Sequence, residues 1–405
     1  MSEQSTLGDV LLGIEAGKSF QTTEVLAREH EMGVLKVSAV TWSAFRPDQA
    51  KVVIGYEPDE RHRVRAGDLL ISRANTRELV GAVVVVDKDY PQRILSDKTL
   101  RLVVDPQRAD KSFLLYALRS ATARAHIEEF ATGSSDSMRN IGQSVITSIP
   151  LVLPPLEEQQ RIAARLKSQL AAVEEARQAA QAQLGEFIRL KTSAIEGIFS
   201  SLTEGRRIGD VARLQSGYAF KSQAFQKNGI RLLRNANILP GMVYWDESVF
   251  LTPEDKDNYA DYDLNDGDIL ISLDRPIISS GIKVARVSCQ DLPALLVQRV
   301  GRFILNQSRV DANYLHLFLQ SARFISAISG HDQSLGVPHI SPRQVEDVVM
   351  PCPDLIEQKR IAGLLADILC VVRDGVHAVE KQINEIKLLP ARLLAQEFGL
   401  VELPV

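Results

Sequence analysis

The chain has 405 residues, of which 45% are hydrophobic and 24% charged, and its formal net charge is −4. These values are typical of a globular protein with two or three domains. They exclude a polycation that binds nucleic acid through charge alone, so any DNA contact requires local basic clusters or a partner.

No apolar run reaches the length of a membrane span, and the N-terminal MSEQSTLGDV lacks the basic and apolar regions of a secretory signal. The three cysteines, Cys289, Cys352 and Cys370, form no CxxC pair. This pattern argues against a disulfide framework or a zinc site and favours a reducing compartment. We therefore expect a cytoplasmic protein without a metal site.

Residues 1–153 are predicted to form the first globular domain. Short β-branched and apolar runs at residues 34–40, 51–54, 69–71 and 83–86 predict strands, with a turn at residues 65–68. The spacing of apolar residues predicts a helix over residues 113–130, and the polar residues 132–140 predict a loop.

Residues 154–203 are predicted to form a long helix that opens with PPLEEQQRIAA. Pro155 suits the first helical turn, and the acidic residues after it complement the positive end of the helix dipole. Apolar residues then recur every seven positions, which is typical of a coiled coil. These residues are Leu166, Val173, Ala180, Phe187 and Ala194.

Residues 204–352 repeat the first domain, and residues 353–405 repeat the helix. Residues 208–211, 217–220 and 266–272 match 7–10, 17–20 and 66–72, while PDLIEQKRIAG at 353–363 repeats 154–164 at an offset of 199 residues. The seven-residue pattern continues in the same register, and we expect this helix to end near Pro390 and both helices to bend or shorten at Gly185 and Gly375. The later apolar residues of the pattern are Leu365, Val372, Val379, Ile386 and Leu393.

The predicted fold class is therefore α+β. Two similar α/β domains are separated by a long antiparallel two-helix coiled coil in a pseudo-two-fold repeat, because helices that match in register along a duplicated chain can pair through one seam.

This organisation resembles the specificity (S) subunits of type I restriction–modification systems. PPLEEQQRIA and PDLIEQKRIA carry the resemblance, each at the start of a long helix after a variable region, with support from residues 35–45, 67–76 and 137–143. The resemblance implies two target-recognition domains that each read one half of a bipartite double-stranded DNA site. It also implies that the helices set the spacing and dock two methyltransferase (M) subunits.

The same resemblance places no catalysis on this chain. S-adenosylmethionine, ATP and Mg are expected on partner subunits, including restriction/translocase (R) subunits of the full complex. The sequence agrees, because it holds no GxGxxG, HExxH or GxSxG motif. Gly13 to Ser19 falls one residue short of a phosphate-binding loop. The alternative is a non-catalytic scaffold that bridges two protein partners without reading DNA.

Candidate DNA-binding residues are those that can reach bases or phosphates, since Arg favours guanine and Asn favours adenine. In the first domain the alternation of Arg61, Arg63 and Arg65 predicts one strand face carrying basic groups. A solvated surface remains the alternative for every cluster. The candidates are Arg61, Arg63, Arg73, Asn75, Arg77, Arg139, Asn140, Arg231, Arg234, Asn235, Asn237 and Arg275.

Candidate partner-binding residues lie at the two helix starts, where the same polar pattern occurs twice. A purely structural coiled coil is the alternative. The candidates are Glu157, Glu158, Gln159, Arg161, Glu357, Gln358 and Arg360.

Overall fold

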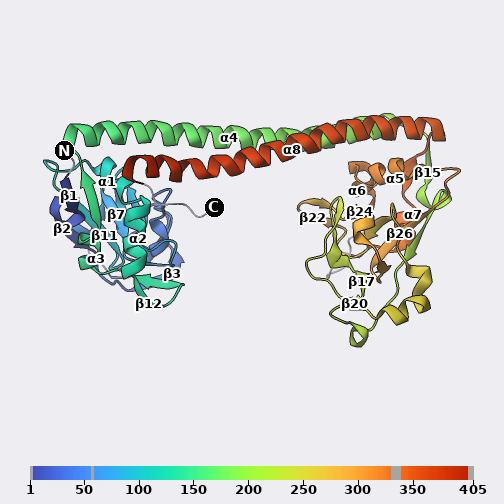
Figure 1. Ribbon diagram of the computed structural model, residues 1–405, viewed down its shortest axis with the longest axis horizontal. Coiled ribbons are helices and arrows are strands. Elements are labelled where there is room, and N and C mark those ends of the chain that lie inside the picture. The colour runs from blue at the N-terminus through green and yellow to red at the C-terminus, as the bar shows by residue number, and fades with distance from the viewer. Residues whose placement is uncertain (1–2, 56–58, 330–338, 400–405) are drawn as a thin grey trace. The chain divides into compact units, whose positions relative to one another are not determined.

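The computed structural model describes residues 3–55, 59–329 and 339–399 (Figure 1). The chain folds into two compact units. Unit 1 comprises Met1–Gln181 and Lys381–Val405, and unit 2 comprises Ala182–Glu380. Each unit therefore combines one predicted globular domain with parts of both predicted long helices, and the predicted helical residues 400–405 lie outside the described residues.

The elements of unit 1 mix short strands with short helices. Its strands are β1 (Glu3–Thr6), β2 (Leu11–Ala16), β3 (Thr22–Leu26), β4 (Gly33–Leu35), β5 (Ala50–Val53), β6 (Arg63–Val64), β7 (Leu69–Ser72), β8 (Ala74–Asn75), β9 (Val83–Val85), β10 (Tyr90–Ile94), β11 (Thr99–Val104), β12 (Thr132–Ser135), β13 (Met138–Asn140) and β14 (Pro150–Leu153). Its helical segments are η1 (Leu7–Val10), η2 (Val37–Ala39), η3 (Glu60–His62), α1 (Lys111–Ala117), α2 (Ala121–Phe130) and α3 (Gln143–Thr147).

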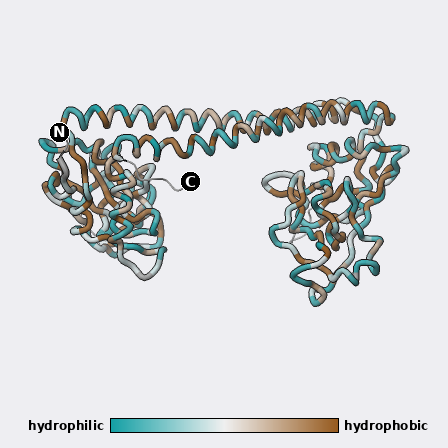
Figure 2. The backbone as a smooth tube through the Cα atoms, in the orientation of Figure 1, coloured by the Kyte–Doolittle hydropathy of each residue, from teal (hydrophilic) through white to brown (hydrophobic). Residues whose placement is uncertain are grey.

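The sheet β2-β11-β7-β9 forms the centre of unit 1. Successive side chains of β7 point to opposite faces, so Leu69 and Ile71 pack toward the helices while Leu70 packs against Val84 on the other side. Because both faces are covered, β7 is a continuous apolar run without polar alternation. Hydrophobic stretches accordingly lie inside the unit (Figure 2).

Two predictions for unit 1 are wrong in detail. The helix predicted over residues 113–130 is two helices, because the Ser120 hydroxyl accepts a hydrogen bond from the Ala123 N–H (3.3 Å) and starts α2. The loop predicted over residues 132–140 is the hairpin β12–β13, which pairs with β8. Polar residues form strands here because a third strand satisfies their backbone groups.

Unit 2 repeats this plan, as the sequence repeat predicted, with the sheet β16-β26-β21-β24 at its centre. Its strands are β15 (Gly205–Arg207), β16 (Ala212–Ser216), β17 (Ile230–Leu233), β18 (Ile238–Leu239), β19 (Met242–Val243), β20 (Phe250–Leu251), β21 (Ile269–Ser272), β22 (Ile277–Ile278), β23 (Gly281–Ile282), β24 (Val284–Arg286), β25 (Ala294–Leu296), β26 (Val300–Leu305) and β27 (Val349–Pro351). Its helical segments are η4 (Ile208–Asp210), η5 (Ser222–Ala224), η6 (Asn235–Asn237), η7 (Pro253–Tyr262), η8 (Cys289–Asp291), α5 (Ala312–Phe318), α6 (Ala322–Ser329) and α7 (Pro342–Glu346).

Matching glycines in the two units explain why residues 17–20 and 217–220 resemble each other. A Cβ at Gly17 would lie 1.8 Å from the Leu95 carbonyl oxygen, and one at Gly217 would lie 2.3 Å from that of Val297. Only glycine allows so close an approach of two backbone segments. Gly13, which begins the near-match to a phosphate-binding loop, lies within β2 and pairs with Val103 instead of forming a loop.

The long helices are α4 (Leu156–Ser201) and α8 (Leu355–Phe398), and they run antiparallel within each unit, as predicted. In unit 1 the Arg165 guanidinium binds the Glu397 carboxylate (2.5 Å), so the start of α4 lies beside the end of α8. In unit 2 the end of α4 and the start of α8 share one core, which contains Phe199 and Leu365. The buried members of the predicted seven-residue pattern are Leu166, Ala180, Leu365, Val372, Val379 and Ile386.

Neither glycine interrupts these helices, contrary to the expected bends. Gly185 is half-buried with the Arg189 guanidinium nearest to its Cβ position at 3.9 Å, whereas Gly375 lies against the ring of Phe187. The expected end of α8 near Pro390 is also wrong, since the helix continues to Phe398. The residues beyond the proline pack on unit 1, where Phe398 and Phe113 meet edge to face at 5.5 Å, and this burial offsets the cost of proline.

Within the described residues, no helix combines the length and the apolar character that crossing a membrane would require.

Candidate nucleic-acid interface

The first candidate surface of unit 1 lies where β7 ends. Arg73 follows the last residue of β7, and the next two residues form β8. Strand β13 pairs with β8, so that Arg139 lies opposite Asn75 and Asn140 lies opposite Ala74. Two candidate clusters that are distant in sequence therefore form one surface. We call Arg73, Asn75, Arg77, Arg139 and Asn140 the strand-end site of unit 1.

Asn75 is buried beneath the strand-end site of unit 1, and its side chain does not face solvent. Only 5% of the residue is exposed. Its amide nitrogen donates to the Val37 carbonyl (3.0 Å) and to the Ser72 hydroxyl (3.3 Å), and its oxygen accepts the Thr76 N–H (2.9 Å). The expectation that Asn75 reads a base is corrected, because its hydrogen-bonding groups are used inside the unit.

The arginines of the site are more accessible. Arg77 lies 3.7 Å from the exposed Glu128 carboxylate, and Arg139 lies 3.1 Å from the exposed Asp136 carboxylate. Ion pairs between exposed groups are worth only about 0–1 kcal/mol, so a phosphate or a base edge can replace the carboxylates. The Arg73 guanidinium makes no hydrogen bond or ion pair to any residue that the structure describes.

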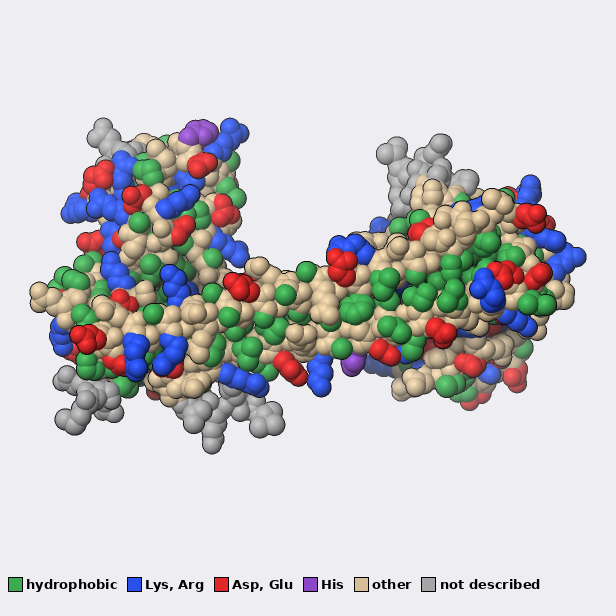
Figure 3. All heavy atoms as spheres, turned by 90° about the horizontal axis from the view of Figure 1, so that it is seen from above, with side chains coloured by type: hydrophobic (Ala, Val, Ile, Leu, Met, Phe, Trp, Pro, Cys, Tyr) green, Lys and Arg blue, Asp and Glu red, His purple; other side chains and the backbone are tan. Residues whose placement is uncertain are grey.

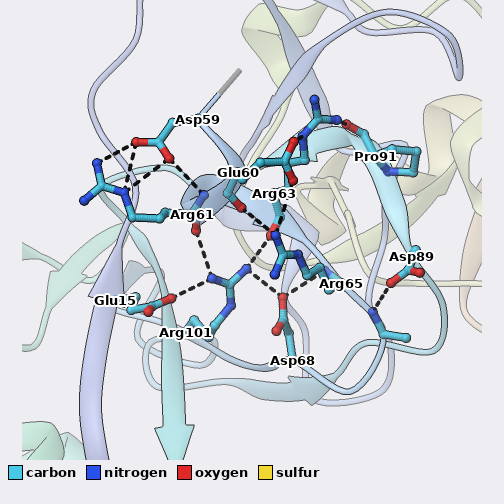
Figure 4. A network of polar contacts seen from close by, with 11 residues as sticks. Glu15, Asp59, Glu60, Arg61, Arg63, Arg65, Asp68, Asp89, Pro91 and Arg101 are labelled. Carbon is cyan, nitrogen blue, oxygen red and sulfur yellow. Dashed lines mark hydrogen bonds and ion pairs between the residues drawn. The ribbon is translucent and has the colours of Figure 1, made fainter. Parts of the chain in front are cut away.

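Arg61 and Arg63 lie near the opposite end of β7, in a separate network (Figure 4). They do not share one strand face as predicted, because Arg61 belongs to η3 and Arg63 to β6. Arg61 binds Asp59 (2.7 Å), whose pKa the Arg61 hydrogen bonds lower to about 2. Arg63 and Arg65 both bind Glu60 (2.6 and 3.3 Å). Their positive charge is thus largely matched by carboxylates.

Arg101 joins this network to the central sheet, and the sequence analysis missed it. Its guanidinium binds Glu15 (2.6 Å) and Asp68 (2.8 Å) and donates to the Arg61 carbonyl (2.9 Å). Although burial opposes the charged form, these carboxylates raise its pKa overall. The second unit repeats the arrangement, since Arg302 binds Asp268 (3.2 Å) and Gln215 (2.7 Å). The sequence repeat could therefore have pointed to Arg101.

The end of β21 in unit 2 corresponds to the strand-end site of unit 1. The Leu273 N–H donates to the Arg299 carbonyl, as the Arg73 N–H donates to that of Lys98. Leu273 therefore takes the place of Arg73, and Asp274 and Arg275 take the places of Ala74 and Asn75. We call Asp274, Arg275, Arg299 and His339 the strand-end site of unit 2.

Four candidates of unit 2, Arg231, Arg234, Asn235 and Asn237, make their contacts within the unit. Arg231 lies over the Trp245 ring (5.1 Å) and donates to the Gln290 carbonyl (2.8 Å). Arg234 donates to the Glu247 carbonyl, and the Asn235 side-chain oxygen accepts from Lys283 (2.7 Å).

Asn237 is 1% exposed, and its amide nitrogen donates to the Tyr244 carbonyl (2.9 Å). The expectation that Asn237 reads a base is therefore wrong, and its side chain instead stabilises the turn η6.

At the two helix starts, the candidate glutamines are buried. Gln159 is 1% exposed and Gln358 is 0% exposed. The Gln159 amide accepts the Asp110 N–H (2.9 Å) and donates to the Arg108 and Pro154 carbonyls (3.1 and 2.9 Å). Gln358 makes the same three bonds in unit 2. Both glutamines therefore attach a long helix to its own unit. The expectation that they contact a partner protein is wrong, because they are buried.

The other candidates at the helix starts remain accessible. Glu158 binds Arg161 and Glu357 binds Arg360, both at 2.7 Å. Figure 3, which looks onto the helices, shows hydrophobic side chains among the charged ones on this surface. The large hydrophobic residues exposed on α8 and α4 are Ile356, Leu364, Val371, Leu388, Ile188 and Leu190.

No group of three His, Cys, Asp or Glu residues that could hold a metal occurs in the described part of the chain.

The fold and the site define a duplicated α+β protein whose two units place different polar groups at equivalent strand ends. The chain belongs to the type I restriction modification DNA specificity domain family, whose model matches residues 2–182 and 201–387.

Two relatives illustrate this membership. The type I restriction enzyme EcoAI specificity subunit of Escherichia coli is 42% identical over 163 residues, which cover 40% of this chain and 28% of that subunit. The MjaVIII specificity subunit of Methanocaldococcus jannaschii is 30% identical over 294 residues, which cover 68% of this chain and 67% of that one.

Solved structures share the fold at lower identity. A chain from a study of complex assembly and conformational transition of the type I R-M system aligns with a TM-score of 0.75 and 18% identity, over 98% of this chain and 97% of that one. The HsdS subunit from Thermoanaerobacter tengcongensis aligns with a TM-score of 0.60 and 19% identity, over 98% and 96%.

Proposed function

We propose that this chain is the DNA sequence-specificity subunit of a type I restriction–modification complex. Each unit reads one half of a bipartite double-stranded DNA site, and α4 and α8 set the spacing between the halves. One observation carries the proposal. Two units with the same central sheet present Arg73, Arg77 and Arg139 at one strand end and Arg275, Arg299 and His339 at the other. A shared framework with different side chains is what reading two different half-sites requires.

The helix starts are proposed to dock two methyltransferase subunits. The pairs Glu158–Arg161 and Glu357–Arg360 present the same exposed geometry in both units. Duplicated surfaces of this kind fit two copies of one partner. The buried glutamines next to these pairs keep each surface in a fixed orientation on its unit.

No chemistry is assigned to this chain. S-adenosylmethionine is proposed to bind the methyltransferase subunits, and ATP and Mg²⁺ to serve them and the restriction/translocase subunits. The net charge of −4 fits this division, because a partner then supplies part of the phosphate contact.

Methylome sequencing of cells that express this chain with its methyltransferase tests the proposal. The expected result is a split motif with two defined half-sites and an undefined spacer. A continuous motif, or no motif, contradicts the proposal and favours a scaffold without DNA reading.

A matched insertion tests the role of the helices. Seven residues are added after Gln181 in α4 and seven after Glu380 in α8, so that the antiparallel pairing is kept. At 1.5 Å per helical residue and 3.4 Å per base pair, the spacer is expected to grow by about three base pairs while both half-sites stay the same. A changed half-site sequence would contradict the spacing role.

A further inference from the structure

Two arginines of unit 2 adopt an unusual backbone conformation. Among the described residues other than glycine, only Arg275 (φ 43°) and Arg299 (φ 68°) have positive φ. Residues with a side chain rarely adopt this region, and those that do cluster at functional sites. Both arginines belong to the strand-end site of unit 2: Arg275 follows Asp274 in sequence, and the Arg299 guanidinium binds the Asp274 carboxylate.

Asp274 holds two basic side chains at once. Its carboxylate is 9% exposed, with one oxygen 2.5 Å from the Arg299 Nη1 and the other 2.8 Å from the His339 Nδ1. The Ser272 hydroxyl donates to the Asp274 carbonyl (2.6 Å), and Asp274 also pairs with His339 in a β-bridge. The carboxylate is therefore fixed by the backbone, and it fixes the direction of both basic groups.

The basic groups themselves face outward. The Arg299 side chain is 63% exposed and that of His339 is 56% exposed. Arg275 is exposed and makes no side-chain hydrogen bond or ion pair to the residues described. Asp274 engages only one nitrogen of the Arg299 guanidinium, so the remaining donors of that planar group can meet a ligand.

Unit 1 has no such arrangement at the equivalent positions. Ala74 takes the place of Asp274. Asn140 takes the place of His339, because the Ile141 N–H donates to the Arg73 carbonyl as the Ile340 N–H donates to the Leu273 carbonyl. Lys98 takes the place of Arg299 and binds its neighbour Asp97 (3.0 Å). The cluster thus belongs to unit 2 alone, which fits base reading better than phosphate contact common to both units.

We propose that Arg275, Arg299 and His339 form a guanine-reading centre of unit 2, with Asp274 as a positioning residue. This inference rests on the proposed function. A guanidinium whose direction is set by a carboxylate can present its remaining N–H donors to the O6 and N7 acceptors of guanine in the major groove. A phosphate contact requires charge but no set direction, so it gives no reason for a buried carboxylate that orients the arginine.

The test uses the full chain in complex with its methyltransferase subunits. Binding of Arg299→Lys and Arg299→Ala is measured on the cognate duplex and on duplexes with single base-pair changes in the half-site of unit 2. Both variants are expected to lose, at one guanine position, discrimination on the order of 10- to 100-fold, while the other half-site is unaffected. Lysine fails here because it lacks the planar fork of arginine.

Asp274→Asn is expected to weaken discrimination at the same position, although Arg299 is still present. Lys98→Ala is the matched control in unit 1 and should leave the unit 2 half-site unchanged. Fluorescence of Trp245 on unfolding confirms that the unit 2 variants are folded, and fluorescence of Trp42 does so for Lys98→Ala.

The proposal of a guanine-reading centre is overturned if Arg299→Lys keeps full discrimination between base pairs. This holds even if Arg299→Ala loses affinity, provided that the loss is equal at all positions. It is equally overturned if neither variant changes the half-site. A wild-type complex that reads no split site would instead contradict the proposed function. The two failures are therefore distinguishable.

Discussion

Replacement of Gly375 by alanine is expected to destabilise the helix pair of unit 2, although alanine is the better helix former. A Cβ at Gly375 would lie 2.4 Å from Cζ and 2.5 Å from Cε1 of the Phe187 ring. These separations are well below van der Waals contact, so the ring must move away from α8. Gly185 provides a matched control, because its Cβ would meet only the Arg189 guanidinium at 3.9 Å.

The change in the free energy of unfolding on Gly375→Ala follows from two opposing effects. Exchanging glycine for alanine inside a helix stabilises it by about 1 kcal/mol. Overpacking at a formed contact costs about 1–3 kcal/mol. Gly185→Ala is thus expected to stabilise unit 2 by about 1 kcal/mol, while Gly375→Ala ranges from no gain to a loss of about 2 kcal/mol. In a Phe187→Ala background the space is open, and Gly375→Ala should recover the full gain.

Each unit contains one tryptophan, Trp42 in unit 1 and Trp245 in unit 2. Urea unfolding of a Trp42→Phe chain, followed by the fluorescence of Trp245, therefore reports on unit 2. A double-mutant cycle of Gly375→Ala and Phe187→Ala should show coupling of about 1–3 kcal/mol. If Gly375→Ala stabilised unit 2 as much as Gly185→Ala, or if the coupling were absent, the ring would not define the approach of α4 and α8.

Three other changes affect stability in predictable directions. Gln358→Leu leaves buried partners unsatisfied, including the Asp311 N–H, and should lower the stability of unit 2 by about 2–4 kcal/mol in the same fluorescence assay; no change would show that the amide is not needed. Pro390→Ala restores a helical hydrogen bond and should stabilise unit 1 by up to about 3 kcal/mol, read from Trp42 in a Trp245→Phe chain; a loss would mean that the proline is required. Burial lowers the pKa of His316 to about 4 from 6.5, and the unfolded chain therefore takes up the proton first as the pH falls. Unit 2 should lose about 3 kcal/mol between pH 7 and pH 4, and His316→Gln should remove this component of the pH dependence.

The sequence was sufficient for features that depend on local pattern. The turn at residues 65–68, the apolar run of β7 and the two helix starts all follow from short-range composition, and the repeat confirms each of them at a second place. The antiparallel pairing of α4 and α8 was predictable for the same reason, since a seam kept in register needs only the spacing of apolar residues.

The candidate sites were less predictable. Residues 132–140 are polar and read as a loop, but they form a hairpin because β8, far earlier in the chain, supplies the missing backbone partner. Asn75, Asn237 and Gln159 look like surface groups in the sequence, and each is buried with its amide hydrogen-bonded inside its unit. Polarity alone does not distinguish a side chain that meets a ligand from one that satisfies the backbone.

The sequence alone determined the duplication, its register and the family of this chain, because glycine turns, strand periodicity and helical spacing are local requirements. Which polar groups face outward was decided only when distant segments met. Arg101 and Asp274 show the reason: the role of a charged side chain depends on the carboxylates, carbonyls and strands around it, and these come from parts of the chain that no local pattern connects.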